Sequence, residues 1–235
     1  MKAIVQRQYG SPDQLTLEER PEPAIGQEEV LVRVRAASVH PDVWHVVRGQ
    51  PYVLRIMGAG VRRPTTLIPG TDMAGVVEAV GEKVTQFAPG DEVFGETIRD
   101  MQWTNGGAYA EYASVPRDSV AMKPPGVTFE EAAAVPTSGL IAHQAIHYQG
   151  EVESGWTVLV NGAGGGVGTF AVQLAKAYGA EVTGVDDTEK QGTIESIGAD
   201  HVLDYRKEDV THRSKRYDLV VDIAQVCKSF AASDH

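Results

Sequence analysis

The sequence has a single cysteine, few basic residues and no long apolar run. Cys227 stands alone among 235 residues, which excludes an internal disulfide and any zinc site built from a cysteine cluster. The 32 acidic residues against 21 lysines and arginines give a net charge of −11, which disfavours nucleic acid or an anionic membrane as a partner. No stretch is long enough to span a bilayer, and residues 1–5 do not resemble a signal peptide. We therefore expect a cytoplasmic protein.

The most informative stretch is glycine-rich and lies at residues 157–168. Its β-branched first part ends at a glycine cluster, and the glycines open an amphipathic helical pattern over residues 169–176. This order, in the register Ala163-x-Gly165-x-x-Gly168, is that of a dinucleotide-binding βαβ unit, where a pyrophosphate meets the N-terminus of the helix. No Lys-Ser or Lys-Thr pair follows, which argues against a P-loop NTPase. The structural alternative is a turn that only packs a helix on a strand.

Acidic residues stand where the second strand of this unit ends. Asp186 lies about twenty residues beyond the glycines, where a carboxylate accepts hydrogen bonds from the adenosine ribose. Asp187 and Glu189 add negative charge that repels a 2′-phosphate, and Lys190 is the one nearby cation that opposes them. The charge of this corner therefore favours NAD over NADP. Asp187 also fits as the N-cap of a short helix over residues 189–197, and the two roles are compatible.

Strand and helix patterns alternate through the second half of the chain. Strands are predicted at residues 157–160, 181–185, 201–205 and 217–222. This alternation predicts an α/β fold with a doubly wound parallel sheet and helices on both of its faces. Such a nucleotide-binding sheet normally has six strands, and residues 224–235 do not continue the pattern. We therefore expect the sheet to be incomplete at the C-terminus.

Short β patterns dominate the first half of the chain. Residues 29–37 alternate with period two, as a half-buried strand does. Further strands are predicted at residues 2–6, 75–80, 91–94 and 108–115. Turn residues separate these segments, which is typical of a small barrel-like β domain. The Pro-Pro-Gly at residues 124–126 marks a change to helical patterns, and Thr128 with Glu131 predicts a capped helix start.

Motif blocks follow one another along nearly the whole chain. They read KAIV at residues 2–5, YGSP at 9–12, ASVHP at 37–41, PGTDMAGVV at 69–77, FAPGDEVFG at 87–95, AAAVP at 132–136 and GADHVLDY at 198–205. Together with the glycine unit, these blocks resemble the medium-chain dehydrogenases/reductases, in the zinc-free quinone oxidoreductase-like and NAD(P)-dependent alcohol dehydrogenase branch. The resemblance implies a GroES-like β-barrel domain over residues 1–124 and a truncated Rossmann domain over residues 125–235.

The resemblance also implies an activity. A zinc-independent oxidoreductase of this kind transfers a hydride between NAD(P)(H) and a small quinone, a carbonyl or alcohol, or an activated alkene. Cofactor contacts are implied or expected at Thr137, Gly164, Gly165, Gly166, Val167, Gly168, Asp186, Asp187, Lys190 and Tyr205. A complete C-terminus would allow a homodimer, since relatives use that segment for much of their dimer contact. The alternative from another class is a truncated relative that binds nucleotide without catalysis.

The zinc-binding members of the family hold their catalytic metal through a cysteine, a histidine with a nearby glutamate, and a second cysteine. The matching positions here are His40, Thr71 with Asp72, and Pro136. Only the histidine is a good ligand, and a catalytic zinc needs three protein ligands. We therefore predict that the protein binds no zinc.

His40 is the candidate proton donor to a substrate oxygen, with Asp42 orienting its ring. Zinc-free relatives usually carry asparagine at the position of His40, so this histidine departs from their pattern. The structural alternative is that His40 only caps the helix that begins near Asp42. His143 and His147 lie one helical turn apart but have no evident third ligand, so we expect them to pack on a helix surface.

Overall fold

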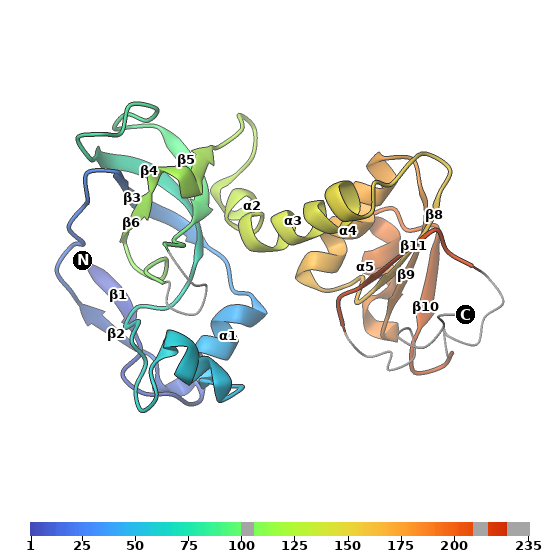
Figure 1. Ribbon diagram of the computed structural model, residues 1–235, viewed down its shortest axis with the longest axis horizontal. Helices are drawn as coiled ribbons and strands as arrows, with labels where there is room; N and C mark the ends of the chain where they lie inside the picture. The colour runs from blue at the N-terminus through green and yellow to red at the C-terminus, as the bar shows by residue number, and fades with distance from the viewer. Residues whose placement is uncertain (100–105, 209–215, 225–235) are drawn as a thin grey trace. The chain divides into compact units, whose positions relative to one another are not determined.

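The computed structural model describes residues 1–99, 106–208 and 216–224 (Figure 1). Residues 225–235, which include Cys227, lie outside these ranges. The expectation of an incomplete domain rests partly on these residues. The chain divides into two compact units, Met1–Thr137 and Ser138–His235. Each unit has its own hydrophobic core.

A five-stranded antiparallel sheet forms the first unit. Its order is β6 (Tyr112–Pro116), β3 (Glu29–Ala37), β4 (Asp72–Val80), β5 (Glu92–Glu96) and β7 (Val120–Met122). The period-two pattern of residues 29–37 is confirmed, because Val30 and Val32 are fully buried and pack with Met73 and Val93. The strand predicted from residue 108 begins only at Tyr112. β7 was not predicted, because three residues are too few to show an alternating pattern.

Shorter elements complete the first unit. Strand β1 (Lys2–Val5) pairs with β2 (Thr16–Glu19), which the sequence pattern did not reveal. Single helical turns occur at Pro12–Gln14, Arg55–Ala59 and Arg117–Ser119. Helix α1 (Pro41–Arg48) begins directly after His40 and ends at Gly49, whose left-handed φ of 60° suits a residue without a Cβ.

Helix α2 (Phe129–Ala133) has the capped start that the sequence predicted. The Thr128 hydroxyl accepts a hydrogen bond from the Glu131 N–H at 3.1 Å, and the Thr128 N–H donates to the Glu131 carboxylate at 2.8 Å. Ala132 and Ala133 are buried against Ala74 of β4. Because α2 packs on this sheet, the division between the compact units falls after Thr137 instead of at the Pro-Pro-Gly turn.

The second unit is a parallel sheet with the strand order β10 (His201–Asp204), β9 (Glu181–Asp186), β8 (Thr157–Asn161) and β11 (Leu219–Asp222). All four strands lie where the sequence predicted them. Its helical segments are α3 (Pro136–His143), Gln144–Gln149, α4 (Gly166–Ala177), Thr188–Lys190 and α5 (Gln191–Ser196). Helix α3 begins two residues before the division between the units. No helix in the described ranges has the length and apolar character needed to cross a membrane.

The side chains of β8 alternate between two apolar clusters. Val158 and Val160 belong to the cluster that includes Ala171 and Val172 of α4, whereas Leu159 belongs to a second cluster with strands β9 and β10. Because all four strands run parallel, their carboxyl ends meet at one edge of the sheet. In doubly wound folds this edge is where ligands bind.

Candidate functional site

The glycine turn connects the end of β8 to the start of α4. Gly162 has a φ of 86°, a conformation that favours glycine, and Gly165 occupies the N-cap position without any side-chain cap among the described residues. The first N–H groups of a helix have no acceptor within the helix. Residues 166–168 therefore present backbone donors and the positive end of the helix dipole at this turn.

Gly168 serves a packing role in the same turn. A Cβ atom built on Gly168 would lie 2.0 Å from the carbonyl oxygen of Gly162 and 2.7 Å from the Cα of Ala163. Both neighbours are backbone atoms, so no rotamer change relieves the overlap. The helix thus approaches the turn closely enough to require glycine, and the packing alternative holds at this residue alongside any binding role.

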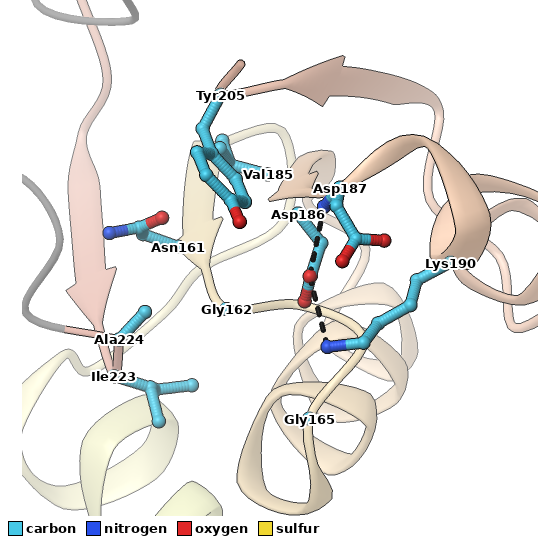
Figure 2. A pocket seen from close by; sticks show the side chains of 10 residues that line it. All are labelled: Asn161, Gly162, Gly165, Val185, Asp186, Asp187, Lys190, Tyr205, Ile223 and Ala224. Atoms are coloured by element: carbon cyan, nitrogen blue, oxygen red, sulfur yellow. Dashed lines mark hydrogen bonds and ion pairs between the residues drawn. The ribbon is translucent and has the colours of Figure 1, made fainter.

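A pocket of about 300 Å³ opens at the carboxyl ends of β8 and β9 (Figure 2). It is lined by Asn161, Gly162, Gly165, Val185, Asp186, Asp187, Lys190, Tyr205, Ile223 and Ala224. The structure thus brings five of the predicted cofactor residues together, whereas Gly164 lies in the adjacent turn and Gly166, Val167 and Gly168 form the start of α4. The other lining residues were missed, although most of them stand at strand ends, which is the signal that points to them.

Asp186 is buried and engaged by the turn itself. Its Oδ2 accepts a hydrogen bond from the Gly164 N–H at 2.9 Å. Its Oδ1 accepts from the Asp187 N–H at 2.9 Å and from Lys190 Nζ at 3.0 Å (Figure 2). Burial acts to raise the pKa of this carboxyl, but the three hydrogen bonds together hold the pKa below its usual value. Asp186 therefore joins β9 to the glycine turn as a carboxylate, and its contact with a ribose stays a prediction.

Asp187 caps a helical turn and also faces a cation. Its Oδ1 accepts from the Glu189 N–H at 3.1 Å, as the capping interpretation expected. Its Oδ2 lies 3.8 Å from Nη2 of Arg206, a second cation at this corner besides Lys190. In the sequence Lys190 is the one nearby cation, because Arg206 comes close only through the pairing of β10 with β9. The local charge is more balanced than the sequence suggested.

A second polar cluster lies inside the first unit, around His40. His40, Thr71, Asp72 and Thr137 are all buried, with Asp72 only 1% exposed. His40 Nε2 is 2.8 Å from Thr71 Oγ1, and this hydroxyl donates to Asp72 Oδ1 at 2.9 Å. Thr137 donates twice to the same carboxylate, from its hydroxyl at 2.6 Å and from its N–H at 2.9 Å. A predicted contact of Thr137 with the cofactor stays a prediction, since both of its donors are used here.

The nearest partners of His40 differ from the one that sequence reasoning chose. Asp42 Oδ2 lies 3.8 Å from His40 Nδ1, which is beyond hydrogen-bond distance. The side chain of His40 makes no capping bond to α1, although the residue occupies its N-cap position. Thr71 and Asp72 hold the ring instead. They lie far from His40 in the sequence, and the available signal was an aspartate directly before the apolar run at residues 73–77.

The carboxylates around His40 govern its protonation. Burial is the largest single influence and lowers the His40 pKa, but the hydrogen bond and charge of Asp72, with the charges of Asp42 and Glu96, together raise it above its usual value. Burial likewise acts to raise the Asp72 pKa, yet the bonds from His40 and Thr137 hold it below the usual range. For Glu96, burial and the charge of Asp72 raise the pKa. The cluster therefore stabilises an imidazolium beside a carboxylate.

The residues at the zinc-ligand positions do not fit a catalytic zinc. The Thr71 hydroxyl is bonded to His40 and Asp72, and the side chain of Pro136 has no ligand atom. Across the described residues, no three His, Cys, Asp or Glu side chains form a group suited to a metal ion. His143 and His147 stack with ring centroids 5.0 Å apart in an aromatic cluster, which agrees with the packing role expected of them.

Comparisons with known proteins match both units. Residues 26–125 match the family described as alcohol dehydrogenase GroES-like domain, and residues 166–233 match the family described as zinc-binding dehydrogenase. The 2-methylene-furan-3-one reductase of Solanum lycopersicum is 36% identical over 228 residues, which are 94% of this chain and 56% of that protein.

Solved structures give the same result. The quinone oxidoreductase of Coxiella burnetii has a TM-score of 0.85 and 32% identity, over 95% of this chain and 68% of that one. The Escherichia coli quinone oxidoreductase complexed with NADPH has a TM-score of 0.75 and 28% identity, over 89% of this chain and 60% of that one. The chain thus spans between half and three quarters of the length of these proteins.

The predicted fold class is confirmed by these matches, with a GroES-like β domain followed by a Rossmann-type parallel sheet. The likeness extends over both units, and it combines sequence identity above 30% with a shared fold. This chain therefore belongs to the medium-chain dehydrogenase/reductase superfamily, in its quinone oxidoreductase-like branch.

Proposed function

We propose that this chain is an NAD(P)(H)-dependent oxidoreductase that works without zinc. Its substrate would be a small quinone, a carbonyl or alcohol, or an activated alkene. The observation that carries the proposal is the pocket at the carboxyl ends of β8 and β9, beside a helix N-terminus with no side-chain cap. The names of the relatives, a furanone reductase and quinone oxidoreductases, support this substrate range.

Each part of the site then has a role. The backbone donors at residues 166–168 would bind the pyrophosphate, and Asp187, Lys190 and Tyr205 would hold the adenosine end. The nicotinamide of the bound cofactor supplies or accepts the hydride. His40 would donate a proton to the substrate oxygen, since its carboxylate partners favour the imidazolium. This role replaces the polarising metal of the zinc enzymes.

Replacement of His40 by asparagine tests the proton donor. We expect kcat for NADH oxidation with a quinone or aldehyde panel to fall about 100-fold, because general acid catalysis contributes that much or more. The fall in rate at alkaline pH that reports on His40 should disappear as well. The matched control is His45→Asn on the same helix, because the His45 ring bonds to the Gln50 carbonyl and packs on Trp44, away from the Asp72 cluster.

Three outcomes of this assay differ in meaning. An unchanged rate and pH profile in His40→Asn would remove the proton-donor role. Enhanced nicotinamide fluorescence on titration, with no turnover on any substrate, would favour a non-catalytic nucleotide-binding protein. Stoichiometric zinc in the purified protein, with activity lost on chelation, would contradict the zinc-free mechanism.

We infer a preference for NADH over NADPH from Asp187, whose carboxylate would repel a 2′-phosphate. In Asp187→Ser, Arg206 would lose its carboxylate partner and could face that phosphate beside Lys190. Lys190 stays paired with Asp186, and serine retains the capping role. We expect the Kd for NADPH to fall about tenfold, or about 1.4 kcal/mol, with a smaller rise for NADH. Glu189→Ser is the control, because it removes the same charge from the same exposed turn outside the pocket lining. Equal shifts in both variants would refute a specific role for Asp187.

A further inference from the structure

The hydrogen bonds around His40 determine which ring nitrogen carries a fixed proton. Asp72 is a carboxylate and can only accept hydrogen bonds. The Thr71 hydroxyl has one hydrogen, and it donates that hydrogen to Asp72 Oδ1 at 2.9 Å. Thr71 Oγ1 can therefore only accept from His40 Nε2, 2.8 Å away. It follows that Nε2 carries a hydrogen whether the ring is neutral or charged.

The other ring nitrogen has a different environment. His40 Nδ1 is buried and has no hydrogen-bond partner among the residues that the structure describes. The nearest carboxylate oxygen recorded for it, Asp42 Oδ2, is 3.8 Å away. A buried ring nitrogen without a partner is uncommon, because it loses its bond to water on folding. Nδ1 therefore has a free lone pair in the neutral ring and a free N–H in the imidazolium.

We propose that His40 exchanges its proton through Nδ1, and that Thr71 and Asp72 are positioning residues that hold Nε2–H in every protonation state. The substrate in this inference comes from the proposed function, whereas the tautomer of the free protein is independent of that function. In the proton-transfer step the Nδ1–H bond breaks and its electron pair stays on Nδ1. Because Nδ1 is buried, the substrate must first displace the side chains that cover it. A lone pair of the substrate oxygen, negatively charged after hydride arrival, then forms the new O–H bond, and the ring becomes neutral.

Asp72 is a poor proton carrier beside Nδ1, because both of its oxygens already accept hydrogen bonds. Oδ1 accepts from the hydroxyls of Thr71 and Thr137, and Oδ2 accepts from the Thr137 N–H. Protonation of this carboxylate would weaken these bonds. Asp72 therefore acts as a fixed negative charge that anchors the ring through Thr71.

Three further titratable groups lie around the pair formed by His40 and Asp72. Asp42 faces the ring from α1, and Glu96 acts on it from β5. The Tyr109 hydroxyl donates to the Ser38 carbonyl, and burial with the charge of Asp72 raises the pKa of Tyr109 to about 12. Tyr109 thus stays neutral over the working range. The charges of Asp72, Asp42 and Glu96 all act to raise the His40 pKa.

The test is NMR of the whole chain labelled with ¹⁵N-histidine, in the absence of substrate. Long-range ¹H–¹⁵N correlations distinguish the two tautomers, and the spectrum of His40→Asn assigns the His40 signals among the seven histidines. Above the His40 pKa, we expect Nε2 to be protonated and Nδ1 to be unprotonated. A neutral ring that carries its hydrogen on Nδ1 would overturn the proposal.

Two variants of Thr71 test the positioning role. Thr71→Ser keeps the hydroxyl and should keep the Nε2–H tautomer. Thr71→Val removes the hydroxyl at nearly constant volume and leaves only the 3.5 Å approach of Asp72 to Nε2, so a mixture of tautomers is expected. A pure Nε2–H ring in Thr71→Val would overturn the role given to Thr71. The serine variant remains informative if the valine variant does not fold.

The proposed function and this inference can fail separately. If the tautomer is as expected but His40→Asn retains full turnover, the assignment of Nδ1 stands and the proton-donor role falls. If the neutral ring carries its hydrogen on Nδ1, the inference falls even though His40→Asn loses activity. Thr71→Val should also change the pH profile of kcat. A purely structural defect would lower kcat at every pH and leave the shape of the profile unchanged.

Discussion

Replacing Gly168 by alanine is expected to destabilise the second unit by about 3 kcal/mol or more, within the range of severe overpacking. The added Cβ would stand 2.0 Å from the Gly162 carbonyl oxygen and 2.7 Å from the Ala163 Cα. Relief requires α4 to move away from the turn, which separates Ala171 and Val172 from the valines of β8. The same movement would displace the backbone donors of the turn, so cofactor binding should be lost with stability.

The matched control is another glycine-to-alanine change within a helix of the same unit. Gly192 lies in α5, and a Cβ there meets no described heavy atom within 4 Å. Gly192→Ala should be neutral or stabilising by roughly 0.5–1 kcal/mol, since alanine has the higher helix propensity. Urea unfolding followed by circular dichroism measures both variants. Equal unfolding midpoints for Gly168→Ala and the parent would contradict the close-packing argument.

Sequence reasoning located the second unit well because its signals are local. The glycine turn and its four strands depend on residues that are neighbours in the sequence, as does the capped start of α2 in the first unit. Period and turn chemistry determine such features before any tertiary contact forms. The division of the chain was less accessible, because α2 belongs with the first unit through its packing on Ala74, which is a tertiary contact.

The partners within the candidate sites depend on pairing across strands. Asp72 meets His40 because β4 begins beside the end of β3, whereas Asp42, which is closer in the sequence, lies farther from the ring at 3.8 Å. Arg206 approaches Asp187 because β10 lies next to β9. A single sequence shows such residues but not their distances. Asp186 is buried and accepts a hydrogen bond from the Gly164 N–H. Its spacing from the glycines in the sequence does not predict this bond.

Replacing Asp72 by asparagine is expected to lower stability by about 3–5 kcal/mol at pH 6, because it removes one partner of a buried pair. The amide would also place a donor against the donors of Thr137 or Thr71. In the parent, Asp72 has a lowered pKa, so its contribution is present above about pH 4 and is lost as pH falls through the folded pKa.

His40 has a raised pKa, so its contribution is complete below about pH 6.5 and is lost as pH rises through the folded pKa. The pair thus stabilises the parent most between about pH 4 and pH 6.5, and parent stability should fall from pH 6 to pH 8. In Asp72→Asn, burial becomes the dominant influence on His40 and favours the neutral ring. The stability of the variant should therefore rise over the same interval.

This opposite slope distinguishes loss of the charge pair from general damage to the fold. Urea unfolding at several pH values between 5 and 8 measures it for both proteins. The control is Glu181→Gln, since Glu181 and His201 form a pair at 3.0 Å with side chains 45% and 54% exposed. Solvent screens such a pair, so the control should lose less than about 1 kcal/mol and keep the slope of the parent. If Asp72→Asn also keeps that slope, Asp72 does not set the charge of His40, because removal of its carboxylate would have left the titration of the ring unchanged.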